Sequence, residues 1–265
     1  MTELELQTAD RIATITINRP EARNAMSRDM WPVLVDMLRG LENDADIGCV
    51  VITGGGGEAF CAGGDVKAMV ERAEGNNPLS VEEETQLLRG FMEAARLLHE
   101  MSKPTIAAIN GACAGAGFAL ALSCDLRLAV SDAKFTTAFA RVAGSGDFGG
   151  SWFLSRIVGT AKARELYYFA RGFDGTEAAE MGVVNAAIAR DNFQGTVDDW
   201  SRRLAAGPTT ALGFMKQNFN LAEHGSLAAA LDQEARNMVL SFRTEDHLEA
   251  AKAFVEKRRP TFKGK

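Results

Sequence analysis

Two glycine-rich segments, each directly after an apolar run, place the strongest constraint on how this chain folds. Residues 60–65 (FCAGGD) follow the run 49–53, and residues 110–117 (NGACAGAG) follow the run 104–109. Glycine and alanine leave the backbone accessible because they carry little or no side chain. Two such loops that converge present a pair of backbone N–H donors to one oxygen, which is the geometry of an oxyanion hole. Either loop alone is equally compatible with an ordinary turn.

Composition and charge restrict the classes of function. The chain has 265 residues, 46% of them hydrophobic and 24% charged, which is typical of a globular protein with a substantial core. Its net charge of -6 argues against non-specific binding to nucleic acid or to an anionic membrane. Residues 1–5 lack the cationic and apolar regions of a signal peptide, and no stretch reaches the roughly 18 apolar residues of a membrane helix. A cytoplasmic location is predicted.

The cysteines are predicted to be free thiols. No CxxC pair occurs, and the histidines stand at no metal-ligand spacing from the cysteines, so neither a disulfide nor a metal site is expected. One cysteine, Cys61, borders the first glycine-rich segment, but no histidine lies near it in sequence to activate it as a nucleophile. A packing role is predicted for Cys61. The four cysteines are Cys49, Cys61, Cys113 and Cys124.

Hydrophobic periodicity predicts an α/β chain that ends in helices. Alternation over 11–18 predicts a half-buried strand, and the runs 48–53 and 125–130 predict two more. Helical spacing follows several of these strands, which favours an α/β fold of strand–strand–helix units. From Asp191 onward the pattern is wholly helical, and an organisational boundary is placed near residue 195, dividing 1–195 from 196–265.

Local signals mark where helices begin. Ser27 is predicted to be the N-cap of the first long helix. Ser80 is predicted to begin another, with Glu83 at the position of a capping-box partner. Between them, the charged stretch through 75–78 is predicted to be an exposed connection.

In their order and flanks, the two glycine-rich segments resemble those of the crotonase (enoyl-CoA hydratase/isomerase) family, and the resemblance covers nearly the whole chain. It implies a spiral of ββα units with a helical C-terminal region and assembly into trimers or hexamers. It also implies an acyl-CoA thioester as substrate, with coenzyme A entering as part of that substrate and no tightly bound cofactor.

The resemblance assigns candidate binding residues. Gly64 and Ala116 match the two backbone donors that hold the thioester oxygen. The middle glycine common in the family is alanine at position 116, and alanine still donates its N–H. Three further segments, 20–25, 62–67 and 253–258, match the places that contact coenzyme A. The candidate CoA-binding residues are Arg23, Ala25, Ala62, Lys67, Phe254 and Lys257.

The acid/base groups of a family hydratase are absent. Hydratases of this family use two glutamates, and the matching positions here hold Ala119 and Phe139, neither of which moves a proton. Asp147 remains, and an aspartate there resembles the isomerase branches of the family, including dienoyl-CoA and ring-epoxide isomerases. Asp147 is therefore the predicted acid/base, although an aspartate at this position is also typical of a helix N-cap or an Asx turn.

Aromatic neighbours are expected to tune Asp147. Phe139, Phe148 and Trp152 are predicted to make its surroundings apolar and to raise its pKa towards neutrality. Glu83 and Glu84, from the region that often borders the acyl pocket, are weaker candidates for a second carboxylate. Residues 144–149 also match GxGxxG, but no clean strand precedes them and the region 20 residues later is typical of a helix, so a dinucleotide fold is rejected.

The predicted function is that of an acyl-CoA enzyme which stabilises a thioester enolate, with isomerisation by Asp147 as the first choice. Three alternatives stay open at this point. They are an enoyl-CoA hydratase with an unusual acid/base set, a thioester or C–C hydrolase, and a CoA-binding subunit without catalytic activity.

Overall fold

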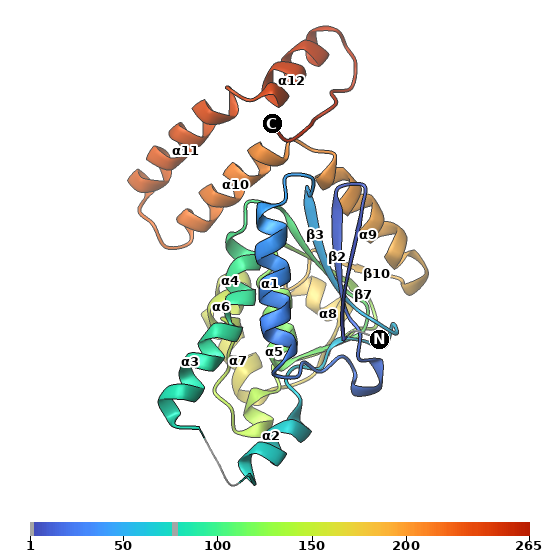
Figure 1. Ribbon diagram of the computed structural model, residues 1–265, viewed down its shortest axis with the longest axis vertical. Coiled ribbons are helices and arrows are strands. Elements are labelled where there is room, and N and C mark those ends of the chain that lie inside the picture. Colours follow the sequence, from blue (N-terminus) through green and yellow to red (C-terminus); the bar gives the residue numbers. More distant parts are fainter. Residues whose placement is uncertain (1–2, 76–78) are drawn as a thin grey trace.

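Ten strands form two sheets in the computed structural model, which describes residues 3–75 and 79–265 (Figure 1). The larger sheet has the order β1-β2-β3-β5-β7-β10, and the smaller has the order β4-β6-β8-β9. The larger sheet consists of β1 (Leu4–Ala9), β2 (Ile12–Ile17), β3 (Cys49–Gly54), β5 (Thr105–Ile109), β7 (Leu126–Val130) and β10 (Ala186–Ile188). The smaller consists of β4 (Ala59–Cys61), β6 (Ala112–Ala114), β8 (Lys134–Thr136) and β9 (Phe173–Asp174).

The strand patterns follow from which faces are covered. In β2 the side chains of Ala13, Ile15 and Ile17 are buried while their neighbours are half-buried, as its alternating sequence predicts. β3 and β5 are buried almost throughout, which matches their continuous apolar sequences. All pairs in the larger sheet are parallel except β1 with β2, and the register places Ile15 opposite Ile52.

Each of β3, β5 and β7 is followed at once by a short strand of the smaller sheet, namely β4, β6 and β8. The chain therefore steps from one sheet to the other in each turn of a spiral and usually returns through a helix. This confirms the predicted α/β fold built from ββα units. The steps from β3 to β4 and from β5 to β6 deliver the two glycine-rich segments, at 60–65 and 110–117, to the same place beside the smaller sheet.

Twelve α-helices and two 3₁₀-helices cover and extend the sheets in the described residues (Figure 1). The helices are α1 (Met30–Asn43), α2 (Val66–Ala73), α3 (Val81–Phe91), α4 (Glu93–Glu100), α5 (Gly115–Leu122), α6 (Gly150–Val158), α7 (Thr160–Phe169), α8 (Gly175–Glu180), α9 (Arg190–Ala205), α10 (Thr209–Ala222), α11 (Leu227–Ser241) and α12 (Glu245–Val255). The 3₁₀-helices are η1 (Pro20–Ala22) and η2 (Phe139–Val142).

Of the two predicted helix starts, one is confirmed and one is wrong. At α3 the capping box is confirmed, because the Ser80 side chain accepts from the Glu83 N–H and the Glu83 carboxylate accepts from the Ser80 N–H. At α1 the predicted cap is wrong. The helix begins at Met30 with Asp29 in the cap position, and no side chain caps it, because the chain at 27–29 is still held in a turn.

The charged stretch after the first glycine-rich segment was predicted to be an exposed connection. Its first part instead forms α2, whose start is capped by Asp65, since that carboxylate accepts from the Ala68 N–H at 3.2 Å. Of the predicted connection at 75–78, residues 76–78 lie outside the described residues.

The C-terminal helices extend away from the body of the molecule (Figure 1). The boundary predicted near residue 195 falls inside α9, where Phe193 and Val197 are buried. The two-part division of the chain therefore stays a prediction. α10 is anchored to the body by Lys216, whose ammonium donates to the Leu98 carbonyl at 2.8 Å and pairs with Asp125 at 2.8 Å.

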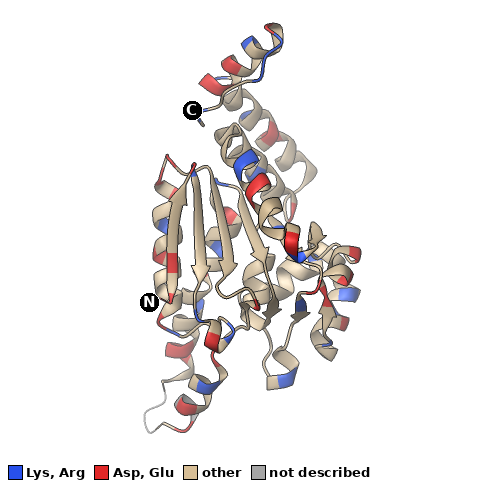
Figure 2. Ribbon diagram, turned by 90° about the vertical axis from the view of Figure 1, so that its right-hand side faces the viewer, with Lys and Arg blue, Asp and Glu red and all other residues tan. Residues whose placement is uncertain are grey.

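Charged residues of both signs are interspersed over the molecule (Figure 2). No helix in the parts of the chain that the structure covers combines the length and the apolar character needed to cross a membrane.

Candidate active site

The two glycine-rich segments touch. Gly63 adopts a positive φ of 98°, which favours glycine, and a methyl group added there would lie 3.0 Å from the Ala114 oxygen and 3.4 Å from the Ala116 nitrogen. The backbones of the two loops can approach this closely only because position 63 has no side chain. The convergence predicted from the sequence is therefore present.

A short bridge fixes the first loop. The Met26 N–H donates to the Gly63 oxygen at 2.8 Å, and the Met26 oxygen accepts from the Asp65 N–H at 3.2 Å. In this parallel bridge the bonds are made by the residues on either side of Gly64. The Gly64 N–H takes no part in the bridge.

A helix start fixes the second loop. β6 ends at Ala114 and α5 begins at Gly115, so Ala116 is the second residue of the helix. Its N–H is one of the first four, which have no partner within a helix, and the helix dipole adds partial positive charge there. Ala116 is 5% exposed. The loop therefore offers a backbone donor at a buried position.

Three of the predicted CoA-contacting residues gather beside the first loop. The Ala62 N–H donates to the Arg23 oxygen at 3.1 Å, and the Ala25 oxygen accepts from the Arg19 guanidinium at 2.8 Å. The Arg23 side chain is exposed. Lys67 is also exposed, in the first turn of α2. Cationic side chains and backbone groups thus share one surface near Gly64.

Two residues that the sequence analysis missed hold this segment in place. Asn24 is fully buried, and its amide donates to the Ala59 oxygen at 2.6 Å while its oxygen accepts from the Arg19 N–H at 2.9 Å. Arg19 also pairs with Asp65 at 3.3 Å. The Ala68 N–H bond together with Arg19 lowers the pKa of Asp65. The polar sequence at 18–24, directly after the predicted strand, was the available signal for them, but it was not used.

Phe254 and Lys257 do not join this group within one chain. Phe254 lies on α12 and is 86% exposed, and Lys257 follows directly after that helix. α12 stands at the opposite end of the molecule from α2, which begins two residues after Gly64 (Figure 1).

Asp147 is not a helix cap. α6 begins at Gly150 with Gly149 in the cap position, and no side chain caps the helix. Among the described residues, the buried Oδ1 atom of Asp147 has no hydrogen-bond partner. Burial raises the pKa of Asp147 to about 6. Buried polar atoms without a partner are rare in folded proteins, so this oxygen singles out Asp147 as a candidate site residue.

The aromatic surroundings of the Asp147 turn come from unexpected elements. Phe148 is buried with a φ of 47°, and its ring centroid lies 4.1 Å from that of Trp31 on α1. Phe139 stacks at 5.8 Å on Tyr167 of α7. Trp31 and Tyr167 were both missed, because each belongs to an ordinary helical pattern far away in sequence.

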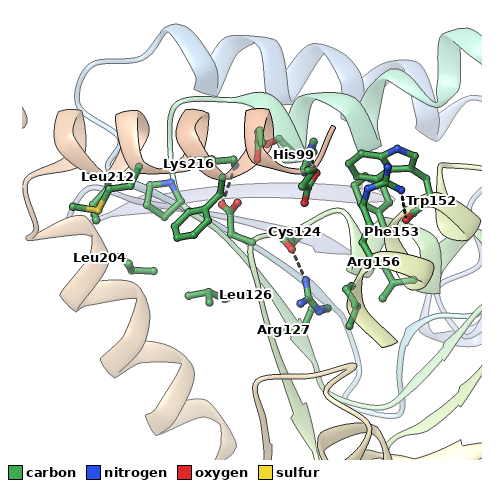
Figure 3. Close-up of a pocket in the computed structure, with 18 residues that line it drawn as sticks. His99, Cys124, Leu126, Arg127, Trp152, Phe153, Arg156, Leu204, Leu212 and Lys216 are labelled. Atoms are coloured by element: carbon green, nitrogen blue, oxygen red, sulfur yellow. Dashed lines mark hydrogen bonds and ion pairs between the residues drawn. The ribbon is translucent and has the colours of Figure 1, made fainter. Parts of the chain in front are cut away.

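Trp152, predicted as a neighbour of Asp147, has other partners. It lines a cavity of about 430 Å³ between α4, α6 and α10, where its ring centroid lies 5.3 Å from that of His99 (Figure 3). The cavity lining does not include Gly64, Ala116 or Asp147. Its charged groups have partners within the protein: Lys216 pairs with Asp125, and His99 lies 3.3 Å from the Glu223 carboxylate. Arg127 and Arg156 donate to the backbone oxygens of Cys124 and Trp152. This cavity therefore belongs to the packing of α10 on the body.

The weaker candidates are occupied elsewhere. Glu83 is held in the capping box, which lowers its pKa, and Glu84 pairs with Arg28 at 3.2 Å on the surface.

Burial raises the pKa of Cys61 to about 12, so its thiol stays protonated and is not activated as a nucleophile. All four cysteines are free and buried.

The GxGxxG match at 144–149 has no dinucleotide-binding context. It follows η2 rather than a strand, and the segment 20 residues later is α7. Its rejection is confirmed.

Comparison with known proteins assigns this chain to a family. A model of the enoyl-CoA hydratase/isomerase family matches residues 7–265. The 1,2-epoxyphenylacetyl-CoA isomerase of Escherichia coli (strain K12) is 36% identical over 257 residues, which are 96% of this chain and 95% of that protein. The crystal structure of an enoyl-CoA hydratase from Polaromonas sp. JS666 matches with a TM-score of 0.90 at 30% identity, covering 98% of this chain and 99% of the other. That of an enoyl-CoA hydratase from Bacillus anthracis matches with a TM-score of 0.92 at 28% identity over 100% of both chains. The chain therefore belongs to the enoyl-CoA hydratase/isomerase family.

Proposed function

We propose that this enzyme is an acyl-CoA isomerase in which Asp147 takes a proton from one carbon of the acyl group and returns a proton to another. The observation that carries the proposal is the buried Oδ1 of Asp147, which has no partner among the described residues. A carboxyl group with a pKa of about 6 is ionised at pH 7 and still basic enough to accept a proton. The 36% identity to an isomerase supports the same reaction class.

The residues at the two positions of the hydratase glutamates support isomerisation over hydration. Ala119 and Phe139 occupy the positions of the two hydratase glutamates, and Ala119 is buried in α5. Hydration needs one group to activate water and another to protonate carbon. Isomerisation needs only one group that accepts and then returns a proton.

The thioester oxygen is proposed to lie between the N–H groups of Gly64 and Ala116. Removal of a proton next to the thioester carbonyl places negative charge on that oxygen. Two fixed N–H donors at the start of α5 stabilise this charge without having to reorient during the reaction. The reaction uses no tightly bound cofactor, because coenzyme A enters with the substrate.

Coenzyme A is proposed to bind along Arg23, Ala25, Ala62 and Lys67. The exposed cationic side chains of Arg23 and Lys67 are proposed to bind its phosphates. Because Phe254 and Lys257 lie at the far end of the same chain, they contact coenzyme A only on a second copy. A homotrimer, or a hexamer formed by two trimers, provides that arrangement. The exposed apolar side chains of α10–α12 favour such an assembly, and they include Met215, Phe219, Leu227, Leu231, Met238, Phe242 and Leu248.

The test is Asp147→Asn. Asparagine keeps the shape of the side chain but cannot accept the proton, so turnover is expected to fall roughly 10²–10⁴-fold while affinity for CoA thioesters is retained. Exchange of acyl hydrogens with D₂O, followed by NMR, should stop as well. Asp36→Asn, on the exposed face of α1, is the matched control and should leave both readouts unchanged. Undiminished turnover with intact exchange would remove Asp147 from the mechanism.

The products of a panel of acyl-CoA substrates separate the remaining readings. Double-bond or ring isomers support the proposal. A 3-hydroxyacyl product identifies a hydratase with a different acid/base set, and released coenzyme A identifies a hydrolase. Tight binding without any product, across the panel, identifies a CoA-binding subunit without catalytic activity.

A further inference from the structure

Tyr167 is a second polar group beside Asp147. Its ring stacks on Phe139 at 5.8 Å, and a methyl group added at Gly146 would lie 2.9 Å from its Cε1 and 3.6 Å from its hydroxyl oxygen. The same hydroxyl also stands against Gly150, where an added methyl group would meet both it and Ala119. The phenol therefore lies along the 146–150 turn, next to the two positions at which family hydratases carry glutamate.

The Tyr167 hydroxyl is available to a ligand. Within the described part of the chain it forms no hydrogen bond to a protein atom, although the residue is half-buried. Burial, together with the nearby Asp147 carboxylate, raises its pKa, so it is a neutral O–H donor throughout the working pH range. Asp147 on the turn thus offers an acceptor, and Tyr167 on α7 offers a donor beside it. Neither forms a hydrogen bond within the described residues.

Gly146 and Gly150 leave the space that the Tyr167 side chain occupies beside the turn. Side chains at positions 146 and 150 would collide with the tyrosine ring or its hydroxyl, so their absence leaves room for the phenol to reach the turn. A phenylalanine at position 167 would fill the same space and stack on Phe139 in the same way, so packing alone does not require the hydroxyl.

We propose that Tyr167 is a specificity-determining residue, whose hydroxyl donates a hydrogen bond to an oxygen carried by the acyl group itself, near the carbon at which Asp147 acts. The inference rests on the proposed function and narrows its substrate class to oxygenated acyl-CoA thioesters, such as those with a hydroxyl or an epoxide close to the thioester. A hydrocarbon acyl group would cover the phenol and leave its O–H donor without a hydrogen-bond partner, which weakens binding.

The experiment measures binding rather than turnover, so it is independent of whether Asp147 is the base. Calorimetry compares butyryl-CoA with 2-hydroxybutyryl-CoA and 3-hydroxybutyryl-CoA on the wild type and on Tyr167→Phe, which keeps the ring and removes only the hydroxyl. We expect the wild type to bind one hydroxyacyl-CoA about tenfold more tightly than butyryl-CoA. Tyr167→Phe should lose that preference and keep its affinity for butyryl-CoA. Tyr168→Phe, one residue further on the same helix and 72% exposed, is the matched control and should behave as the wild type.

Three results would overturn the inference. The first is a wild type without preference for either hydroxyacyl-CoA. The second is a Tyr167→Phe variant that weakens all three ligands equally, which is the result of a packing role. The third is an unchanged ligand preference in Tyr167→Phe with a raised apparent pKa in the rate profile, which would mean that the hydroxyl serves Asp147 instead. A failure of the proposed function appears elsewhere, as undiminished turnover in Asp147→Asn.

Discussion

Asp147 carries its charge only above an unusually high pH for an aspartate, and this sets the pH dependence of the reaction. Its pKa of about 6 arises from burial, which disfavours the ionised form. Because a base must be ionised to accept a proton, kcat/KM should rise tenfold per pH unit below about 6 and level off above it. A rate profile from pH 4.5 to 8 on a slowly reacting acyl-CoA measures this. An acid limb centred near pH 4 would contradict the assignment.

Single positions differ in how far the sequence alone determines their role. The absence of proton carriers at 119 and 139, and the presence of Asp147, follow from aligned motifs. Trp31 and Tyr167 were not predictable, because α1 and α7 bring them to the turn across long stretches of chain and their own spacing is that of ordinary helices. Trp152 was assigned to the same turn, but its position on α6 directs it towards His99.

At the scale of elements, the first glycine-rich loop should depend on one N–H group. Gly64→Pro removes that donor. The two hydrogen bonds of the Met26 bridge are retained, because residues 63 and 65 make them. Loss of one such donor is expected to lower kcat roughly 10²–10³-fold.

Gly64→Ala is the matched control for the proline variant. It introduces the same contact with the flexible end of Met69 but keeps the N–H, so most of the activity should survive. Steady-state kinetics measures kcat of both variants, and circular dichroism verifies that both are folded. A large loss of kcat in Gly64→Pro alone supports the role of the Gly64 N–H. Equal losses in the two variants would point to crowding of the loop rather than to a lost donor.

The elements themselves were largely predictable, because their signals are local. Strand alternation at 11–18, the capping box at Ser80 and the helical pattern after Asp191 all appear in the structure. Helix α2 was not predicted, because its sequence is charged and short and its start depends on Asp65, which also pairs with Arg19. The contact between the two glycine loops was an inference from their resemblance to a family, since no local pattern encodes which loops meet.

At the scale of the whole molecule, the separation of α12 from the first glycine loop predicts sites that are shared between copies. Stacking of an aromatic side chain on an adenine base contributes about 1–3 kcal/mol, so Phe254→Ala should raise KM about 5- to 150-fold if Phe254 stacks on coenzyme A. Val255→Ala, at the next exposed position of α12, is the control and should leave KM unchanged.

Mixed oligomers then show which copy supplies Phe254. When Phe254→Ala and Asp147→Asn chains are co-expressed with different tags and purified together, every active site with an intact Asp147 lies on a chain that lacks Phe254. If Phe254 reaches a neighbouring copy, the Asp147→Asn chain lends its own Phe254 to those sites, and a fraction of the activity should return to the KM of the wild type. If Phe254 serves its own chain, all activity in the mixture should keep the raised KM. The second result would contradict the arrangement proposed from the position of α12.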